Sequence, residues 1–289
     1  MDNNDPSRGV LVLGGTSLVG RFAAPRLAAR GISATALSRD PPADPPPGVV
    51  WIKGDVGDAD LAARLPKATT VLSLSPIWLL PAALPALLAN GMTRIVAFSS
   101  TSRFTKQDSP DAYERRVAQR LAEGEAAVMA SGAAWTILRP TLIYAEGRDG
   151  NVTRLARLIA RLGVLPLAGR GEGLRQPVHA DDLAAAALAA AGAQAAENKA
   201  YDMPGGETLT YREMAARVFE GLGRRPRLLA VPPLNWRVGL TLASPLLPGA
   251  TAAMGMRMAE DLTFDGAPAA RDFGWAPRPF RPDFRGVKL

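Results

Sequence analysis

The sequence contains no cysteine and only one histidine, His179. The missing thiols exclude structural disulfides, thiolate metal sites and cysteine nucleophiles, and a single histidine excludes metal sites built from several histidines. We therefore expect no metal, and we give His179 a structural role as a buried or hydrogen-bonded side chain. An apolar targeting segment is also missing, because the polar residues MDNNDPSRG lead directly into the first apolar run. This pattern predicts a cytoplasmic location.

Two long stretches lack charged residues, 68–93 and 238–256. Three prolines interrupt the first, which we interpret as a strand, a loop and a helix of a buried sheet. Two prolines and three glycines interrupt the second, which we interpret as a cover over a C-terminal lobe. We expect no membrane-spanning helix in either stretch.

Acidic residues are fewer than basic ones. The sequence has 27 aspartates and glutamates and 34 lysines and arginines, which gives a formal net charge of +7. Clustered cations attract polyanions, but these arginines are spread over nearly every segment. The densest patches, 115–120 and 224–227, have no interleaved aromatic residues that would stack on bases. We predict a solvated basic surface and no nucleic-acid partner.

Short apolar runs alternate regularly with longer amphipathic segments. This alternation indicates βαβ units and a parallel sheet. The predicted strands are 10–13, 33–37, 49–52, 70–74, 94–98, 135–138 and 200–203. The predicted helices are 18–30, 59–65, 79–89, 112–130, 151–162, 182–191 and 211–221. The prolines of DPPADPPPG, residues 40–48, predict a stiff loop in place of a crossover helix.

The first strand leads directly into a glycine-rich turn and an amphipathic helix, in VLVLGGTSLVGRFAAPRLAARG. This order makes the glycine pattern a credible dinucleotide-binding fingerprint. Gly14 permits the tight turn and Gly20 lets helix and strand pack closely. The backbone N–H groups of Ser17, Leu18 and Val19 can then face a pyrophosphate. Ser17 replaces the usual middle glycine, and its hydroxyl can donate to phosphate. The predicted contacts are Gly14, Thr16, Ser17, Leu18, Val19 and Gly20.

The residues after the second strand bear on the choice between the two nicotinamide dinucleotides. NAD sites place an acid there for the ribose hydroxyls, and NADP sites place a cation for the 2′-phosphate. Ser38 and Arg39 favour NADP(H), whereas Asp40, one step later, leaves NAD(H) open. Asp55, after the third strand, is a candidate acceptor for the adenine amino group, with Val56 beside it. The alternative for Asp55 is a loop or helix-capping acid.

These features predict an α/β protein, a Rossmann-type doubly wound parallel sheet with a smaller C-terminal substrate lobe. With 47% hydrophobic residues, the 289-residue chain can bury a substantial core. We place the NAD(P)-binding domain at residues 8–165 and the substrate lobe at 166–289, interleaved as one continuous unit. The proline-rich end, from residue 277, is predicted to be an extended arm along the surface.

Six segments in this order resemble the short-chain dehydrogenase/reductase superfamily, in the extended or atypical branch that contains nucleotide-sugar epimerases and dehydratases. They are GGTSLVG, GDVGD, IVAFSSTS, WTILRPTLIY, RQPVHADDLAAAA and DMPGGETLTYREMAARV, and they span at least residues 10–220. The resemblance implies a Rossmann core with a substrate lobe drawn mainly from the C-terminal third. It also implies further cofactor contacts at Leu74, Ser75, Ser99 and Pro140, the last against the nicotinamide.

Catalysis in this superfamily uses a Ser or Thr after the fifth strand and a Tyr whose pKa is lowered by a Lys four residues later. Thr101 matches the Ser/Thr position, and Tyr113 is the only tyrosine at the start of the following helix. Four residues after Tyr113 stands Val117, and the nearest cations are Arg115 and Arg116. Either Tyr113 acts with an arginine, or the usual pair is lost.

Arg175 and Asn151 are the substrate contacts that the resemblance implies. In nucleotide-sugar enzymes, an arginine in the segment that matches RQPVHADD reaches the substrate diphosphate, and an asparagine at the start of a helix helps to hold it. A surface or capping role is the alternative for both residues. Asp182 is expected to be an N-cap or first-turn acid of the helix that follows it.

Two functions remain open. The first is an NADP(H)-dependent oxidoreductase or epimerase that acts on a carbonyl or sugar-nucleotide-like small molecule, and Thr101 and Arg175 favour it. The second is a non-catalytic dinucleotide-binding regulator or accessory subunit, and the missing lysine favours it. Proteins resembling the nitrogen-metabolite regulator or the nucleotide-binding accessory subunit of respiratory complex I keep the glycine turn without the Tyr/Lys pair. The sequence does not decide between a monomer and a homodimer.

Overall fold

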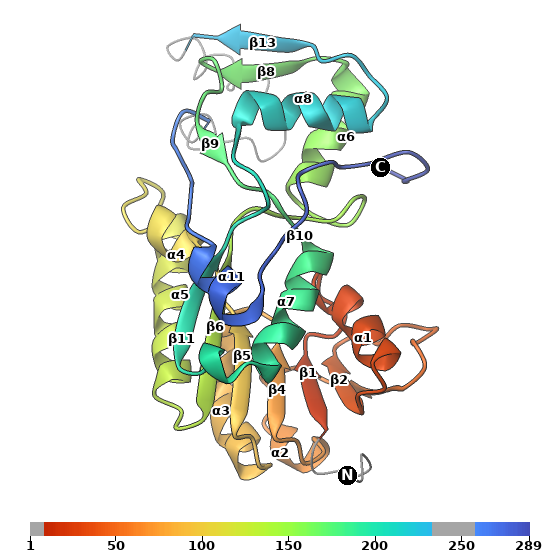
Figure 1. Cartoon of the computed structure of the whole chain (residues 1–289), viewed down its shortest axis with the longest axis vertical. Coiled ribbons are helices and arrows are strands. Elements are labelled where there is room, and N and C mark those ends of the chain that lie inside the picture. Colours follow the sequence, from red (N-terminus) through yellow and green to blue (C-terminus); the bar gives the residue numbers. More distant parts are fainter. Residues whose placement is uncertain (1–8, 233–257) are drawn as a thin grey trace. The chain divides into compact units, whose positions relative to one another are not determined.

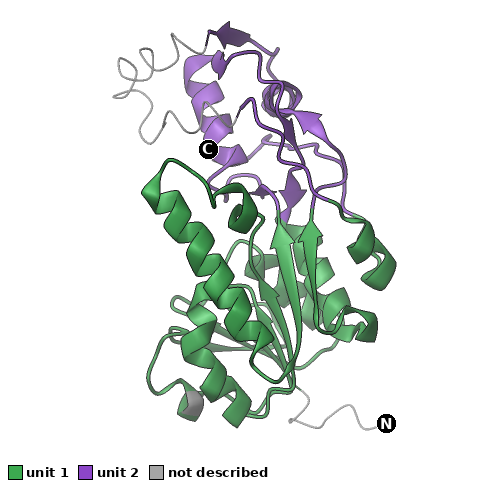
Figure 2. Ribbon diagram, turned by 90° about the vertical axis from the view of Figure 1, so that its left-hand side faces the viewer, with its two compact units in different colours: residues 1–140, 180–203, 265–276 green, residues 141–179, 204–264, 277–289 purple. Residues whose placement is uncertain are grey.

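The computed structural model describes residues 9–232 and 258–289. The chain forms two compact units, each assembled from three segments (Figure 2). Unit 1 comprises residues 1–140, 180–203 and 265–276, and unit 2 comprises residues 141–179, 204–264 and 277–289. This division differs from the predicted boundary at residue 165, because the chain enters unit 2 directly after the sixth strand. It then returns to unit 1 twice, with residues 180–203 and with residues 265–276. The uncharged stretch 238–256 lies outside the described residues.

Unit 1 is built on a seven-stranded sheet in which every pairing is parallel (Figure 1). Its strands are β1 (Val10–Leu13), β2 (Ala34–Ser38), β3 (Val49–Lys53), β4 (Thr70–Ser73), β5 (Arg94–Phe98), β6 (Ala134–Pro140) and β11 (Lys199–Met203). The strand order is β11-β6-β5-β4-β1-β2-β3, so the order reverses at β1. Ligands of open parallel sheets bind beyond the carboxyl ends of the strands at such a reversal. The predicted Rossmann-type fold is confirmed.

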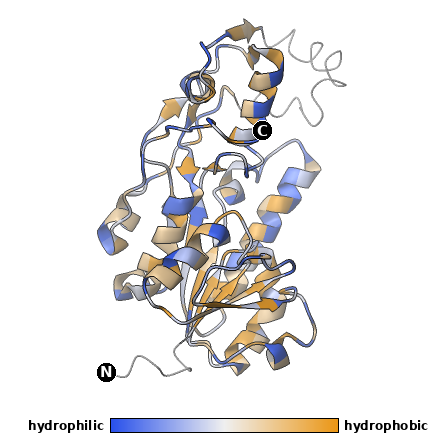
Figure 3. Ribbon diagram, turned by 90° about the vertical axis from the view of Figure 1, so that its right-hand side faces the viewer, coloured by the Kyte–Doolittle hydropathy of each residue, from blue (hydrophilic) through white to orange (hydrophobic). Residues whose placement is uncertain are grey.

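Helices cover both faces of this sheet. They are α1 (Gly20–Ala29), α2 (Leu61–Arg64), α3 (Leu80–Ala89), α4 (Ser102–Thr105), α5 (Ala112–Met129), α7 (Ala180–Gly192) and α11 (Ala267–Phe273), with 3-10 turns η2 (Ile77–Leu79) and η3 (Gln194–Ala196). α1 packs against α7, and α3 packs against α5. Leu84 and Leu121 share one apolar cluster with Leu11 and Ile95 of the sheet. Figure 3 shows the strands as a strongly hydrophobic layer.

Unit 2 combines two helices with short strand pairs. Its elements are β7 (Ile143–Tyr144), α6 (Val152–Leu162), β8 (Leu165–Ala168), β9 (Leu174–Arg175), β10 (Val178–His179), β12 (Leu209–Thr210), α8 (Tyr211–Gly221) and β13 (Leu228–Val231). Phe219 of α8 is fully buried, together with Phe280 of the C-terminal segment. The prediction of a surface arm after residue 277 is therefore wrong in part, because Phe280 and Phe284 anchor this segment in the core of unit 2.

The predicted strands and helices agree with the observed ones to within two residues at each end. The loop 40–48 contains no helix, as predicted. The sequence missed the short strands of unit 2 and the helices α4 and α11, because segments of two to seven residues carry too little periodicity to be recognised. Within 9–232 and 258–289, no helix is both long and apolar enough to cross a membrane.

Candidate dinucleotide-binding site

The turn between β1 and α1 is shaped by glycines that cannot carry a side chain. Gly14 has a φ of +80°, and a Cβ added to it would lie 2.9 Å from the backbone nitrogen of Ser75. A Cβ on Gly20 would lie 2.2 Å from the carbonyl oxygen of Gly14. Both clashes are with backbone atoms, which cannot rotate away. The close approach of helix and strand predicted for Gly20 is therefore present.

The hydrogen bonds of the turn decide which N–H groups remain available. The N–H groups of Gly14 and Gly15 both donate to Leu37 O at 3.1 Å, and the N–H of Ser17 donates to Gly14 O at 2.9 Å. Ser17 Oγ accepts from the N–H of Gly20 at 3.0 Å. These bonds close a tight turn, so α1 begins at Gly20, two residues later than predicted.

Of the three N–H groups predicted to face a pyrophosphate, that of Ser17 is wrong, because it donates within the turn. Those of Leu18 and Val19 are left for an anion. Within the described residues, the N–H groups of Leu18 and Val19 donate to no other backbone group. They lie at the positive end of the helix dipole, where negative charge is stabilised. Because Ser17 Oγ serves as an acceptor, its own proton remains available to donate. The turn has the geometry of a pyrophosphate cradle.

The end of β2 holds the side chains predicted to select the dinucleotide. Ser38 is buried, and its Oγ lies 2.5 Å from Thr16 Oγ1 and accepts from the N–H of Asp40 at 3.3 Å. The Arg39 side chain is 81% exposed, and its Nε lies 3.8 Å from Asp55 Oδ2. An ion pair this exposed contributes little energy, so the guanidinium can turn toward a phosphate.

Asp55 also accepts from the N–H of Gly57 at 2.9 Å, which is a loop-stabilising role. Val56 beside it is buried. On the other side of the turn, Leu74 and Ser75 are buried directly after β4. Trp51 of β3 packs beneath Gly15, since a Cβ on that glycine would lie 2.7 Å from the indole Cζ3. A natural fluorophore therefore lies under the glycine turn.

The predicted catalytic residues lie in different environments. Thr101 is buried, and its N–H and Oγ1 both donate to Pro140 O at 3.2 Å. Tyr113, at the start of α5, is 66% exposed. Its backbone N–H donates to Asp111 Oδ1 at 2.7 Å. In the described part of the chain, no hydrogen bond joins the two side chains, so the structure does not bring them together.

Ser99 leads to a polar cluster that the sequence did not reveal. Its Oγ donates to Glu125 Oε1 at 2.6 Å. Glu125, on α5, has no exposed surface and accepts from Arg139 Nε at 2.9 Å and Arg139 Nη2 at 2.7 Å. Arg103 Nη1 also donates to it. The only sequence signal was an acid on the buried face of an amphipathic helix.

The charge state of this cluster follows from its partners. Burial by itself would raise the pKa of Glu125, but hydrogen bonds from Arg139 and Ser99 outweigh burial and hold that pKa below its ordinary value. Glu125 is therefore a carboxylate. Oδ1 of Asp202, on β11, lies 3.9 Å from Nη1 of Arg139. Burial raises the pKa of the Asp202 carboxyl group.

In unit 2, the two predicted substrate residues are held by backbone groups. Asn151 Nδ2 donates to Ile143 O at 3.2 Å, and its N–H donates to Asp149 Oδ1 at 2.8 Å. Arg175 is buried, and its Nη1 donates to the carbonyl oxygens of Leu174 and Glu260, each at 2.7 Å. The helix α6 is capped by Asp149 rather than by the Asn151 side chain.

Two structural assignments made from the sequence are confirmed. His179 is buried, and its Nε2 lies 3.3 Å from Glu146 Oε2. Asp182 lies in the first turn of α7. Among the described residues, no group of three or more histidine or acidic side chains could hold a metal ion.

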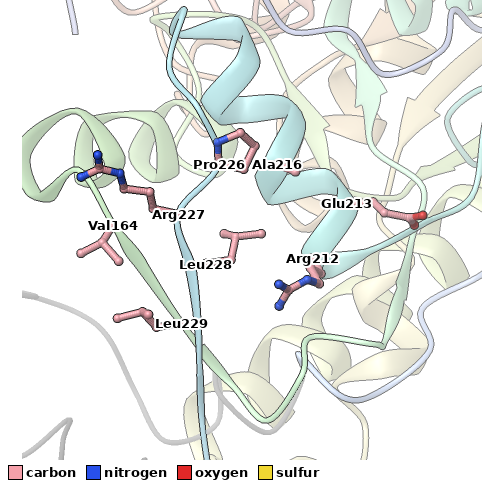
Figure 4. Close-up of a pocket in the computed structure, with 8 residues that line it drawn as sticks. All are labelled: Val164, Arg212, Glu213, Ala216, Pro226, Arg227, Leu228 and Leu229. Carbon is pink, nitrogen blue, oxygen red and sulfur yellow. The ribbon is translucent and has the colours of Figure 1, made fainter.

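An open pocket of about 700 Å³ lies in unit 2, and none of the predicted site residues lines it (Figure 4). Its lining consists of Val164, Arg212, Glu213, Ala216, Pro226, Arg227, Leu228 and Leu229. The Glu213 carboxylate is already used, because it accepts from the N–H and hydroxyl of Thr210 in a capping box.

Comparison with known proteins agrees with the geometry of the turn. Residues 14–192 match the model of a family described as NAD(P)H-binding. The chain belongs to this NAD(P)H-binding family. A reductase of (4-alkanoyl-5-oxo-2,5-dihydrofuran-3-yl)methyl phosphate from Streptomyces griseus is 33% identical to it, covering 74% of each chain. NAD(P)H azoreductase of Xenophilus azovorans is 28% identical, covering 77% of each.

Solved structures show the same fold at lower identity. MoeE5 in complex with UDP-glucuronic acid and NAD has a TM-score of 0.74 and 19% identity, covering 96% of this chain and 97% of its own. UDP-glucose 4-epimerase of Thermus thermophilus in complex with NAD has a TM-score of 0.67 and 21% identity, covering 96% of both chains. These likenesses confirm the predicted fold, and the family match confirms the predicted NAD(P)-binding family.

Proposed function

We propose that this member of the NAD(P)H-binding family is an NADP(H)-dependent oxidoreductase that acts on a carbonyl or sugar-nucleotide-like small molecule in the cytoplasm. The observation that carries the proposal is the turn at 14–20. There Gly14 and Gly20 leave no room for a Cβ, and the N–H groups of Leu18 and Val19 find no backbone acceptor in the described residues. A pyrophosphate fits such a turn. The dinucleotide, when bound, supplies the hydride.

The exposed guanidinium of Arg39 supports NADP(H) over NAD(H). It follows β2, where a cation suits the 2′-phosphate, and its partner Asp55 is 3.8 Å away and itself exposed. The buried Ser38 hydroxyl is already bonded to Thr16, so Arg39 is the side chain left to discriminate.

The cofactor choice is tested by titrating intrinsic tryptophan fluorescence with NADPH and NADH. We expect tighter binding of NADPH, and we expect Arg39→Ala to weaken NADPH about tenfold with little effect on NADH, since one charge-assisted contact is lost. Arg30→Ala is the control, because Arg30 is an exposed arginine at the far end of α1. Equal affinity of the wild type for both dinucleotides would contradict the NADP(H) assignment.

Substrate reduction is supported by the two named relatives, which are both reductases. Thr101 and Tyr113 remain the proposed catalytic pair, and Asn151 and Arg175 remain the proposed substrate contacts. The test is NADPH oxidation with an azo dye, a phosphorylated dihydrofuranone and a nucleotide sugar as substrates. We expect turnover of one class, and we expect Thr101→Val to reduce kcat about a hundredfold through loss of a positioned hydroxyl.

A second function, dinucleotide binding without chemistry, is favoured by one observation. Tyr113 is 66% exposed, and Val117 stands one helical turn later in place of lysine. If this function is correct, NADPH binds, none of the three substrate classes is consumed, and Tyr113→Phe changes no measured property. Loss of turnover in Tyr113→Phe would instead establish the enzyme.

A further inference from the structure

The segment that follows β5 is attached to a single buried carboxylate at two points. Ser99 Oγ donates to Glu125 Oε1 at 2.6 Å, and four residues later Arg103 Nη1 donates to Oε2 of the same group. Between these points, the N–H and hydroxyl of Thr101 donate to Pro140 O at 3.2 Å. The conformation of the segment at 99–103 is therefore fixed at both ends and in the middle.

The carboxylate is itself held by β6. Arg139, next to Pro140, approaches Glu125 with both Nε and Nη2, at 2.9 and 2.7 Å, which is a bidentate pair. The guanidinium carbons of Arg103 and Arg139 lie 5.3 and 5.1 Å from the ring centre of Phe104, within the range of cation–π contacts. The cluster thus couples α5, the end of β5, α4 and the end of β6.

No other acid in the cluster could replace Glu125. Asp202 lies 3.9 Å from Arg139, beyond hydrogen-bond distance, and its Oδ1 is buried without a hydrogen-bond partner in the described residues. Without the charge of Glu125, the guanidiniums of Arg103 and Arg139 would converge on Phe104 with no carboxylate hydrogen-bonded between them. Removing one partner of such a buried pair leaves the other charges uncompensated.

The strands that carry the cluster indicate which half of a bound dinucleotide would lie near it. The cradle for the pyrophosphate follows β1, and Arg39 follows β2. Strands β5 and β6 lie on the opposite side of β1, beyond β4. In a fold of this order, the adenosine half extends over β2 and the nicotinamide half extends over β4 and β5. The segment held by Glu125 therefore adjoins the nicotinamide half only.

We propose that Glu125 is a positioning residue for the nicotinamide end of the site, and that it acts by holding residues 99–103, with Thr101 among them, against β6. This inference rests on the proposed function, because it requires that the dinucleotide binds to unit 1. Glu125 touches neither the cofactor nor the substrate in this assignment. Its effect passes through Ser99 and Arg103.

The experiment measures the affinity of the Glu125→Gln variant for two ligands and compares each with that of the wild type. NADPH has both halves, whereas 2′-phospho-ADP-ribose has the same adenosine and phosphates without nicotinamide. We expect Glu125→Gln to weaken NADPH about tenfold, because charge-assisted hydrogen bonds are lost, and to leave 2′-phospho-ADP-ribose unchanged. Thermal unfolding of each variant verifies that it is folded.

Arg94→Met is the matched control. Arg94 is buried at the other end of β5, and its Nη2 donates to Thr136 Oγ1 at 2.6 Å and Ala190 O at 2.8 Å. We expect this variant to lower the unfolding temperature and to change neither affinity. A milder variant, Arg103→Met, removes only one attachment of the segment, and we expect it to weaken NADPH selectively by about threefold.

Three results would overturn the inference. Glu125→Gln could weaken both probes equally, it could change neither, or Arg94→Met could show the same selective loss of NADPH. If Glu125→Gln fails to fold, Arg103→Met decides by the same comparison of the two probes. Failure of dinucleotide binding, the part of the proposed function on which the inference rests, is a separate outcome, since the wild-type protein would then bind neither probe.

Discussion

The two units of this protein divide its charge unequally. Unit 1 contains 17 lysines and arginines against 18 acidic residues, whereas unit 2 contains 17 against 9. The net charge of +7 is therefore the sum of −1 in unit 1 and +8 in unit 2. Unit 1 offers a pyrophosphate backbone N–H groups and a helix end rather than a surplus of cations. The surplus of cations therefore lies in unit 2.

The two units also differ in how their backbones are held. In unit 1, seven parallel strands order the chain, and the glycine turn depends on close backbone contacts. In unit 2, the sheets have two strands each, and side chains such as Phe280 and Asp149 fix the segments between them. The comparison predicts that function in unit 1 is sensitive to added atoms and that stability in unit 2 is sensitive to removed ones.

The largest effect is expected for Gly20→Ala in unit 1. Its new Cβ would lie 2.2 Å from Gly14 O and 2.6 Å from Gly15 O, so the turn must open. We expect loss of more than about 3 kcal/mol of folding free energy, at the upper end of overpacking costs, together with loss of dinucleotide binding. Gly192→Ala, where a Cβ meets nothing within 4 Å, is the control. Normal NADPH titration of Gly20→Ala would remove the cradle assignment.

The next effect is expected for Phe280→Ala in unit 2. Its ring is fully buried and packs edge-on against Tyr144, with ring centres 4.9 Å apart. We expect a loss of about 3–5 kcal/mol in the free energy of unfolding, measured by urea denaturation. Leu289→Ala is the control, because Leu289 is 37% exposed in the same segment. A loss below about 1 kcal/mol would mean that the C-terminal segment does not belong to the core.

The smallest effect is expected on the pH dependence of stability, through the Glu146 carboxylate of unit 2. Burial would raise the pKa of Glu146, but the hydrogen bond from His179 and other contacts lower it below the ordinary value of 4.5. A lowered pKa in the folded state means that Glu146 stabilises the fold above pH 4.5, and that this contribution is lost as the pH falls through the folded-state pKa.

We therefore expect Glu146→Gln to be less stable than the wild type by about 1 kcal/mol at neutral pH, with the difference shrinking below pH 4.5. The measurement is the urea midpoint as a function of pH. Glu172→Gln is the control, since Glu172 is 73% exposed and should change little at any pH. A difference that is constant across the titration would exclude the carboxylate as its cause.

The fold of unit 1 could be predicted because its signals are local. Apolar runs, glycine positions and proline breaks located its seven strands and its helices other than α4 and α11 to within two residues. The Rossmann-type parallel sheet and the NAD(P)-binding family could be predicted from the same pattern. The short strands of unit 2 could not be predicted in this way, because two-residue strands such as β9 and β12 exist only through pairing with a distant partner.

The same distinction between local pattern and distant contact applies to the candidate site. Gly14 and Gly20 could be predicted from a strand-turn-helix pattern, and Arg39 from its position after the second strand. The partners of Ser99 and Arg175 could not, because Glu125 is 26 residues from Ser99 and Glu260 is 85 residues from Arg175. The exposure of Tyr113 could not be predicted from the sequence either, since it depends on which segments pack near the start of α5.

By itself, the sequence determined the dinucleotide fingerprint, the parallel sheet and the absence of thiol chemistry, because each is a property of residue type and spacing. Only the tertiary structure decided that the N–H of Ser17 donates within the turn while those of Leu18 and Val19 do not, that Glu125 joins four segments and that Phe280 is a core residue. These features arise from contacts between segments far apart in the chain, and hydrogen-bond geometry and burial exist only once those segments have packed.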